Sequence, residues 1–322
     1  MIANKQYRMP AEWEPQSGVQ LTWPHAQTDW APMLDEITAT YREMAREIKK
    51  REPLLVVGPP SNDTWARDHG FITLVPKDGQ RTERLLLDFC FNGWGEKFEA
   101  KLDNALNRRL YDNGSVTGRY VDHLDFVLEG GSIESDGKGT IFTTTCCLMA
   151  PHRNQPLTHD EIEARLKEYL CAERVVWIDH GWLAGDDTDG HIDTMVRTAP
   201  NDTLLYITCD DPTDAHYPEL RLMEEQLRTF RTLDGRPYRL LSLPLPRPIY
   251  DEEGLRLPAT YANFLVVNGA VLVPTYAQPD LDAEALKTIG EAFPDREIVG
   301  IDCRSIIRQH GSLHCCTMQF FL

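Results

Sequence analysis

Four polar loops in this 322-residue chain carry the ionisable side chains best suited to chemistry. They read SNDTWARDHG (61–70), LEGGS (128–132), DTDGHID (187–193) and HGSLHC (310–315). Loops that occupy equivalent places in a repeated fold point to one end of that fold, even when they are far apart in sequence. The side chains expected to converge there are Asp68, Glu129, His191, Asp193 and Cys315, a carboxylate-rich set with one thiol.

Such a set suits covalent chemistry on a planar cation. A cysteine becomes a useful nucleophile when a protonated histidine lowers its pKa, and His191 is a candidate for that role toward Cys315. Paired carboxylates can hold a guanidinium through two hydrogen bonds, which fixes its plane so that the central carbon faces the sulfur. The residues therefore predict a substrate with an arginine-like group.

The pair His191 and Asp193 has two further interpretations. The two residues lie at the start of a predicted strand, 192–196, so we expect their side chains to share one face. An H-x-D pair can also bind a metal, but a stable site needs three or four ligands. No His pair at i, i+4 and no Cys pair at metal spacing accompanies this one. A buried histidine satisfied by its neighbours is the other alternative. We predict no metal.

Cys315 and Glu129 could also have structural roles. A free cysteine packs as a small hydrophobic residue, so Cys315 could fill the core. Cys316 is expected to face the opposite way and is the weaker candidate nucleophile. Glu129 precedes two glycines, which allow a sharp turn or a close approach to a ligand, but it could equally be an exposed loop carboxylate.

The remaining candidate residues also have a structural interpretation when each is considered alone. Asp68 could be a turn residue, and Arg67 could pair with any nearby acid. Trp94 stands between two glycines, where an indole can form a pocket wall or fill the core.

The elements that must position these loops recur along the chain. Helical periodicity predicts five helices, with a Thr158–Glu161 capping box before the third and Pro294 ending the fifth. The apolar positions of these helices run from Leu34 to Ile48, Phe98 to Leu110, Ile162 to Leu170, Leu220 to Phe230 and Leu286 to Phe293. Their starts are about 60 residues apart, and a fixed period indicates repeated supersecondary units.

Strand-like runs follow the helices. The first set is 54–57, 175–178, 238–243 and 298–301, with a weaker run at 120–121, and the second set is 71–75, 192–196 and 264–267. Each unit thus reads roughly as strand, loop, strand, helix. Five such units predict an α/β fold closed as a pseudo-fivefold α/β propeller, and an open doubly wound sheet is the alternative. We expect one domain over residues 1–322.

The charge and composition of the chain limit the classes of molecule that it is expected to bind. With 33 Lys and Arg against 50 Asp and Glu, the net charge of −17 disfavours nucleic acids and anionic membranes. A cationic substrate suits this charge, although a solvated acidic surface is a sufficient explanation. The N-terminal residues 1–13 lack the apolar core of a signal peptide, so we expect a cytoplasmic protein. The eight cysteines include no C-x-x-C and predict reduced thiols.

Taken together, the motifs resemble agmatine deiminases and the bacterial peptidylarginine-deiminase-like proteins of the guanidino-group-modifying (pentein) superfamily. The similarity runs nearly end to end. It includes MPAEWEP (9–15), NDTWARD (62–68), FNGWG (91–95), LEGGS (128–132), RN (153–154), GHID (190–193), YANF (261–264), FPDR (293–296) and LHC (313–315).

This resemblance implies a pentein propeller and a deiminase that hydrolyses agmatine to N-carbamoylputrescine and ammonia, a step of putrescine biosynthesis, without metal or organic cofactor. It implies that Cys315 is the nucleophile and His191 the general acid and base. Asp68 and Asp193 would clamp the guanidinium, and Glu129 would orient and charge-stabilise His191. The further residues predicted to bind substrate are Arg67, Trp94 and Asn263.

The loop before the nucleophile departs from the family pattern. The family reads GGGNIHC, whereas this chain reads QHGSLHC at 309–315, so the imidazole of His310 could change the charge or size of the pocket. Alternative substrates are therefore another small guanidine or peptidylarginine.

Other functions remain open. An amidinotransferase would share the covalent intermediate, and a non-catalytic binding protein could share the scaffold. A papain-like hydrolase is disfavoured because its cysteine precedes its histidine, the reverse of the order here. A homodimer is expected only from base rates.

Overall fold

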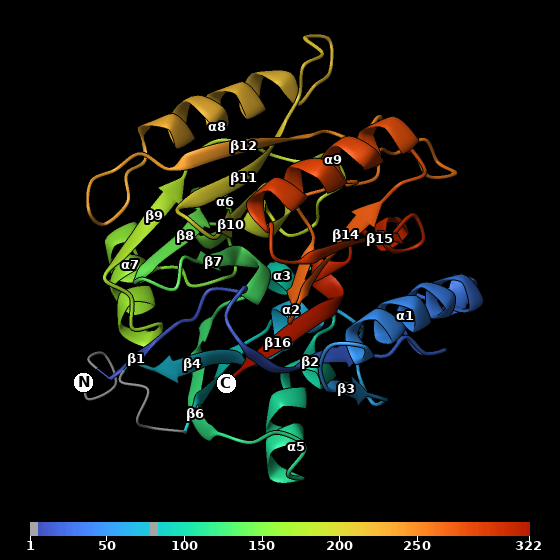
Figure 1. The fold of residues 1–322 in the computed structure, drawn as a ribbon. Coiled ribbons are helices and arrows are strands. Elements are labelled where there is room, and N and C mark those ends of the chain that lie inside the picture. The colour runs from blue at the N-terminus through green and yellow to red at the C-terminus, as the bar shows by residue number, and fades with distance from the viewer. Residues whose placement is uncertain (1–5, 78–82) are drawn as a thin grey trace.

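The computed structural model of the protein describes residues 6–77 and 83–322. Of the N-terminal residues 1–13 considered above, residues 1–5 therefore lie outside the described part of the chain. Five β-sheets follow one another around the molecule (Figure 1). In order of pairing, their strands are β16 (Thr317–Phe321), β2 (Gln16–Thr22) and β3 (Leu54–Val57); β1 (Tyr7–Arg8), β4 (Ile72–Pro76), β5 (Leu85–Cys90) and β6 (Arg119–Val127); β7 (Ile133–Ser135), β8 (Thr140–Thr144) and β9 (Arg174–Ile178); β10 (Val196–Ala199), β11 (Thr203–Thr208) and β12 (Arg239–Pro244); β13 (Leu265–Val267), β14 (Ala270–Thr275) and β15 (Glu297–Asp302).

All five sheets obey one rule. Apart from β1, which adds to the edge of the second sheet, the first strand pairs antiparallel with the second, and the second pairs parallel with the third. A helical connection joins the second strand to the third, as parallel pairing requires. The first sheet combines β16 with β2, and this pairing of the two chain ends closes the ring. The predicted pseudo-fivefold α/β propeller is therefore confirmed.

The helices surround the ring of sheets. They are α1 (Leu34–Lys49), α2 (Ala66–His69), α3 (Gly93–Glu96), α4 (Lys101–Asn104), α5 (Leu106–Asp112), α6 (Thr145–Leu148), α7 (His159–Tyr169), α8 (Tyr217–Thr229) and α9 (Pro279–Ala292). In Figure 1, α1, α5, α7, α8 and α9 lie around the periphery, whereas the short helices α2 and α3 lie near the centre. In the part of the chain that the structure describes, no helix combines the length and hydrophobicity needed to cross a membrane.

Local sequence explains the longest helices. In α1, the side chains of Ile37, Met44 and Ile48 are fully buried, and burial of each stabilises the fold by about 1.5–3 kcal/mol. At the start of α7, the Glu161 carboxylate accepts a hydrogen bond from the Thr158 backbone N–H at 2.8 Å, and the Thr158 hydroxyl accepts one in return. The predicted capping box is therefore confirmed.

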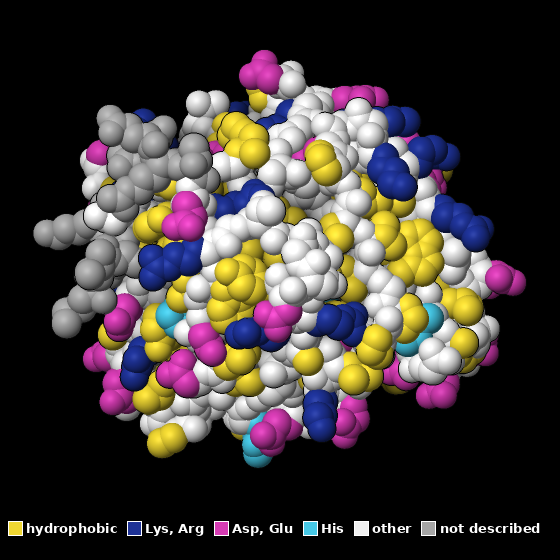
Figure 2. Space-filling view, turned by 90° about the horizontal axis from the view of Figure 1, so that it is seen from below, with side chains coloured by type: hydrophobic (Ala, Val, Ile, Leu, Met, Phe, Trp, Pro, Cys, Tyr) yellow, Lys and Arg dark blue, Asp and Glu magenta, His cyan; other side chains and the backbone are white. Residues whose placement is uncertain are grey.

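Figure 2 shows the face seen from below, where Lys, Arg, Asp and Glu side chains are interspersed with small groups of hydrophobic ones. On this face the acidic charge is spread over the surface rather than gathered in one patch. All eight cysteines are free thiols, as predicted.

Three local predictions were wrong. The second predicted helix is interrupted at Ala105, between α4 and α5, and Phe98 and Leu102 are exposed, so its apolar stripe is not a core face. Residues Ile192–Thr194 form a 3-10 turn rather than a strand, and β10 begins only at Val196.

The third error concerns the repeating unit, which has one strand more than the pattern indicated. The missed strands are the middle ones, β2, β5, β8, β11 and β14. These strands are almost entirely buried, so their sequences lack the apolar-polar alternation that identifies a half-exposed strand.

Candidate active site

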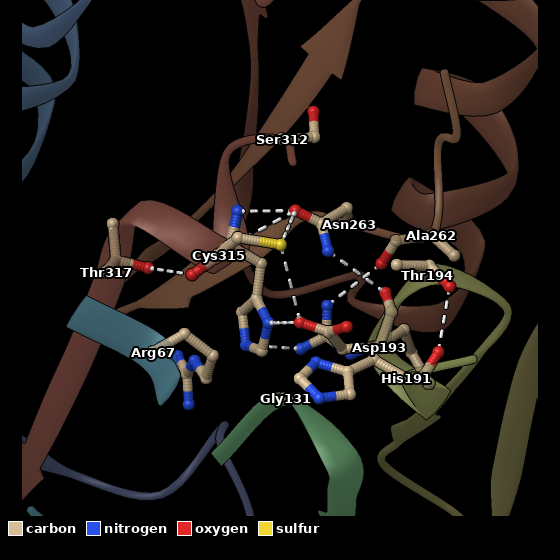
Figure 3. Close-up of polar contacts among 12 residues, drawn as sticks. Arg67, Gly131, His191, Asp193, Thr194, Ala262, Asn263, Ser312, Cys315 and Thr317 are labelled. Atoms are coloured by element: carbon tan, nitrogen blue, oxygen red, sulfur yellow. Dashed lines mark hydrogen bonds and ion pairs between the residues drawn. The ribbon is translucent and has the colours of Figure 1, made fainter. Parts of the chain in front are cut away.

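Five short segments meet at the centre of the ring, each just before the first strand of a sheet. They are α2, the 3-10 turns Gly130–Ser132, Ile192–Thr194 and His314–Cys316, and the loop at Asn263. Because the five sheets share one connectivity, the segments that enter their first strands lie at the same end of the ring. The predicted convergence of distant loops therefore occurs, and Figure 3 shows several of its residues facing one another.

A cavity of about 200 Å³ opens onto this centre. Asp68 and Cys315 line it together with the aromatic side chains of Trp65, Trp94 and Phe98. Its other lining residues are Asp29, Asp63, Asp186, Asp187, Thr188, Thr194, Gln309, His310 and Gly311. Five aspartates line this cavity, so its walls favour a cationic ligand.

Cys315 is buried against acceptors and acids. Its Sγ lies 3.4 Å from Asn263 Oδ1 and 3.9 Å from Asp193 Oδ2. Burial raises the pKa of the Cys315 thiol well above its usual value, and the negative charges of Asp193 and Asp68 raise it further. This shift is opposite in direction to the lowering expected from His191, because burial and the two acids favour the thiol form. A cation bound beside the sulfur would favour the thiolate.

Asp68 is held by two donors. Its Oδ2 accepts a hydrogen bond from Trp94 Nε1 at 2.9 Å, and its Oδ1 accepts one from the Gly131 backbone N–H at 3.0 Å. Burial is the main cause that raises the pKa of Asp68 to about 6. The charge of His191 opposes this shift, whereas the charges of Asp193 and Glu129 increase it. The predicted residue Trp94 thus lines the cavity and also orients Asp68.

Asp193 differs from Asp68 in its electrostatics. Its Oδ2 faces His314 Nδ1 at 2.7 Å, and its Oδ1 is a buried oxygen for which the described residues offer no hydrogen-bond partner. Burial by itself raises the pKa of Asp193, but the hydrogen bond and charge of His314, with the charges of His191 and Arg197, lower it overall. The ionised carboxylate therefore presents a free oxygen to an incoming ligand.

His191 is fully buried, and neither ring nitrogen has a hydrogen-bond partner among the described residues. Its Nδ1 lies 3.6 Å from Asp68 Oδ1. Buried polar atoms are rarely left unpaired in a folded protein. Together with Asp193 Oδ1, the two nitrogens therefore mark a place for a polar ligand.

Glu129 has a different partner from the one expected. Its carboxylate accepts hydrogen bonds from Arg153 Nε at 3.1 and 3.3 Å, and Arg153 also bonds Asp189 at 2.6 Å. Glu129 lies within 4.8 Å of His191, so its charge acts on the imidazole without a hydrogen bond. The orienting contact to His191 predicted for Glu129 is absent from the described residues.

Three residues predicted to bind substrate, Asp193, Arg67 and Asn263, are not among those that line the cavity, although Asp193 Oδ2 lies 3.9 Å from Cys315 Sγ. Arg67 Nη1 lies 3.1 Å from Glu12 Oε1, and its Nη2 donates to Gln319. Asn263 Oδ1 accepts hydrogen bonds from the backbone N–H groups of His314 and Cys315 at 2.9 and 3.3 Å. Arg67 is therefore part of the surrounding framework, and Asn263 positions the segment that carries the thiol.

The sequence prediction missed a buried network behind the thiol. His314 Nε2 lies 2.7 Å from Glu12 Oε1, and Arg197 Nη2 donates to Glu12 Oε2 at 2.6 Å. Arg197 Nε also donates to Glu134 at 2.6 Å. Both residues belong to motifs identified from the sequence, since Glu12 lies within MPAEWEP and His314 directly precedes Cys315. Their contact could not be predicted, because they are neighbours only in the folded chain.

Two sets of potential metal ligands occur among the described residues, Glu129, Cys147 and His191 in one and Glu12, Glu134 and His314 in the other. In the first, Arg153 bonds the Glu129 carboxylate, and burial raises the pKa of the Cys147 thiol well above its usual value. In the second, Arg197 bonds both acids. Because arginine charges already neutralise these carboxylates, neither donor set favours a cation.

Gly131 is the point at which three of the predicted side chains meet. A Cβ there would lie 2.6 Å from His191 Nδ1, 2.8 Å from Asp68 Oδ1 and 3.1 Å from Asp193 Oδ2. We expect Gly131→Ala to displace these groups and to reduce kcat/KM at least about 100-fold, since small misplacements have effects of this size. Steady-state kinetics and Tm measure this. Gly58→Ala is the matched control because nothing lies within 4 Å of its added Cβ. Equal activity of the two variants would contradict the assignment.

Comparison with known proteins finds similarity over nearly the whole chain. The model of the Porphyromonas-type peptidyl-arginine deiminase family matches residues 8–320. The agmatine deiminase of Stutzerimonas stutzeri (strain A1501) is 31% identical, with 97% of this chain and 95% of the relative covered.

Solved structures are similar over the same extent. The "Putative Arginine Deiminase from Porphyromonas gingivalis" is 49% identical with a TM-score of 0.92, covering 98% of each chain. A C. jejuni agmatine deiminase with substrate bound is 36% identical with a TM-score of 0.91, covering 98% of this chain and 96% of the other.

Proposed function

The chain belongs to the Porphyromonas-type peptidyl-arginine deiminase family, and we propose that it is a cysteine-dependent hydrolase that converts agmatine to N-carbamoylputrescine and ammonia. The observation that carries this proposal is that the Cys315 thiol and the Asp68 carboxylate line an acidic cavity, with Asp193 3.9 Å from the sulfur and His191 3.6 Å from Asp68. Carboxylates bind a guanidinium, and a thiol is the nucleophile that can attack its carbon.

The first half of the reaction forms a covalent intermediate. The guanidinium binds between Asp68 and Asp193, and its positive charge offsets the negative charges that keep Cys315 protonated. The Cys315 sulfur bonds to the guanidinium carbon, and its proton passes through His191 to the leaving nitrogen. The carbon–nitrogen bond then breaks, ammonia leaves, and a thiouronium remains on the enzyme.

The second half hydrolyses that intermediate. His191 removes a proton from water, and the water oxygen bonds to the thiouronium carbon. The carbon–sulfur bond breaks, Cys315 is regenerated, and the ureido product leaves. Overall, one water is consumed and one ammonia is released, with no change of oxidation state.

The outer part of the cavity suits the rest of agmatine. Agmatine carries a primary ammonium at the end opposite its guanidinium. Beyond Asp68, the cavity is lined by Asp29, Asp63, Asp186 and Asp187. These acids favour a second cation, whereas they disfavour the α-carboxylate of free arginine.

The test is the release of ammonia and ureide from agmatine, arginine, an arginine-containing peptide and methylated arginines, with a metal chelator present throughout. Selective turnover of agmatine is the expected result. A new guanidine formed without ammonia would indicate an amidinotransferase instead, and no reaction with any of these guanidines would contradict the proposal.

The pKa of Asp68 predicts how kcat/KM for agmatine depends on pH. Its pKa of about 6 means that the carboxylate which binds the guanidinium is present above this pH and is protonated below it. We expect kcat/KM for agmatine to fall as the pH is lowered through about 6, because the guanidinium itself stays charged. A kinetic profile from about pH 5 to about pH 8 measures this. In Asp68→Asn the acidic fall should disappear, and a flat wild-type profile would contradict the assignment.

Three further expectations remain proposals. We propose that the chain is one domain, which the pairing of β16 with β2 supports because both chain ends share a sheet. A cytoplasmic location and a homodimer also stay predictions.

A further inference from the structure

His310 has an unusual backbone conformation at the mouth of the cavity. Its φ is +66°, in the left-handed region that L residues rarely occupy and that glycine occupies without cost. Its side chain is about one third exposed (34%) and also lines the cavity, so the ring lies at the boundary between cavity and solvent. A residue retained in a strained conformation at such a place points to a function.

The ring of His310 reaches across to another wall of the cavity. Its Nδ1 lies 2.8 Å from the carbonyl oxygen of Gly185, and because a carbonyl can only accept, Nδ1 carries the proton and donates. The same nitrogen is 3.8 Å from Asp187 Oδ2. Asp186, Asp187 and Thr188, which directly follow Gly185, also line the cavity. The imidazole therefore bridges two walls.

The segment that carries His310 is held in place on both sides. The Gln309 side-chain amide donates to the backbone carbonyl of Asp29 at 3.1 Å, and Asp29 also lines the cavity. On the other side, a Cβ at Gly311 would lie only 2.2 Å from the ring of Trp65, so the backbone there is packed directly against the indole. These contacts hold the loop against its neighbours, and the side chain at position 310 borders the opening of the cavity.

We propose that His310 sets the upper size limit of the substrate, by closing the mouth around a small free guanidine and excluding an arginine within a peptide. The inference rests on the proposed function and narrows its substrate class. An arginine in a peptide needs room for chain on both sides of its α-carbon, which the bridge to Gly185 denies. The cavity of about 200 Å³ is filled instead by a compact guanidine.

The experiment compares kcat/KM for agmatine with kcat/KM for a short peptide with arginine at its centre. We expect the wild type to prefer agmatine strongly, and His310→Gly to raise the peptide-to-agmatine ratio at least about tenfold. His310→Asn should raise it as well, because asparagine tolerates the left-handed region but its shorter side chain leaves the bridge open. This second variant keeps the test valid if glycine loosens the loop.

Asn201→Gly is the matched control. Asn201 has a φ of +61° in the exposed turn between β10 and β11, so glycine relieves the same backbone strain away from the cavity. Its ratio should equal that of the wild type. Tm values of all variants verify that they are folded.

The outcomes separate the two proposals. Wild-type turnover of agmatine with an unchanged ratio in both His310 variants would overturn the size limit and leave the proposed function standing. Equal wild-type use of peptide and agmatine would also overturn the size limit. Absence of wild-type turnover of any guanidine would overturn both.

Discussion

Replacing Cys315 with alanine is expected to abolish turnover of agmatine, with kcat reduced by on the order of 10⁴-fold or more. The expectation follows from the position of the sulfur, which lines the cavity and lies 3.9 Å from Asp193 Oδ2, where a guanidinium would be held. Without the sulfur no thiouronium can form, and the acids of the cavity supply no alternative nucleophile. Ammonia release under saturating agmatine measures the loss.

Cys316→Ala is the control, since the two cysteines are neighbours and both are buried. The Cys316 sulfur is turned away from the cavity and lies 3.4 Å from the Ser312 carbonyl oxygen, and burial raises its pKa to about 12. This variant should keep most activity. An equal loss in both variants, at similar Tm, would show that the segment and not the Cys315 sulfur is what matters.

The second large effect is expected from Asp193→Asn and Asp68→Asn, each of which should lower kcat/KM about 10²- to 10³-fold. An amide keeps nearly the shape of the carboxylate but loses the charge that pairs with a guanidinium. At Asp193 it also weakens the contact with His314 Nδ1, now 2.7 Å long. Steady-state kinetics on agmatine give the size of the loss.

Binding distinguishes a clamp from a merely structural acid. In the Cys315→Ala background, which cannot react, the Kd for agmatine should rise when either aspartate is changed to asparagine. Asp280→Asn is the control, because Asp280 is exposed and pairs with Arg247 outside the cavity. Near-normal kinetics in Asp68→Asn and Asp193→Asn would refute the clamp.

Much of the fold could be predicted from the chain because the signals are local. An apolar stripe such as Ile37, Tyr41, Met44 and Ile48 is determined by spacing along one helix, and the Thr158 capping box spans only four residues. Their repetition indicated five units. The middle strands escaped this reasoning, because a strand buried on both faces has no alternation to mark it.

Most residues of the site could also be predicted from short sequence motifs. The chain itself indicated a thiol, a histidine and several carboxylates in loops at equivalent places of a repeat, and Asp68, His191, Asp193 and Cys315 do meet. The hydrogen-bond or ion-pair partner of each of these side chains could not be predicted from the motifs. Glu129 bonds Arg153 rather than His191, and Arg67 faces Glu12 rather than the cavity.

The number of repeats, four of the five long outer helices and the types of side chain at the centre of the ring could therefore be predicted from the sequence alone. The pairing of each acidic side chain with its basic partner became visible only in the tertiary structure. The same holds for the hydrogen bond of Asn263 to the Cys315 backbone and for the contact of His310 with Gly185 across the opening of the cavity. The physical reason is that helices form by contacts a few residues apart. The site is instead assembled from five loops whose contacts span up to about 300 residues, such as Glu12 with His314. Among many similar carboxylates, only their positions in the closed ring select the partners.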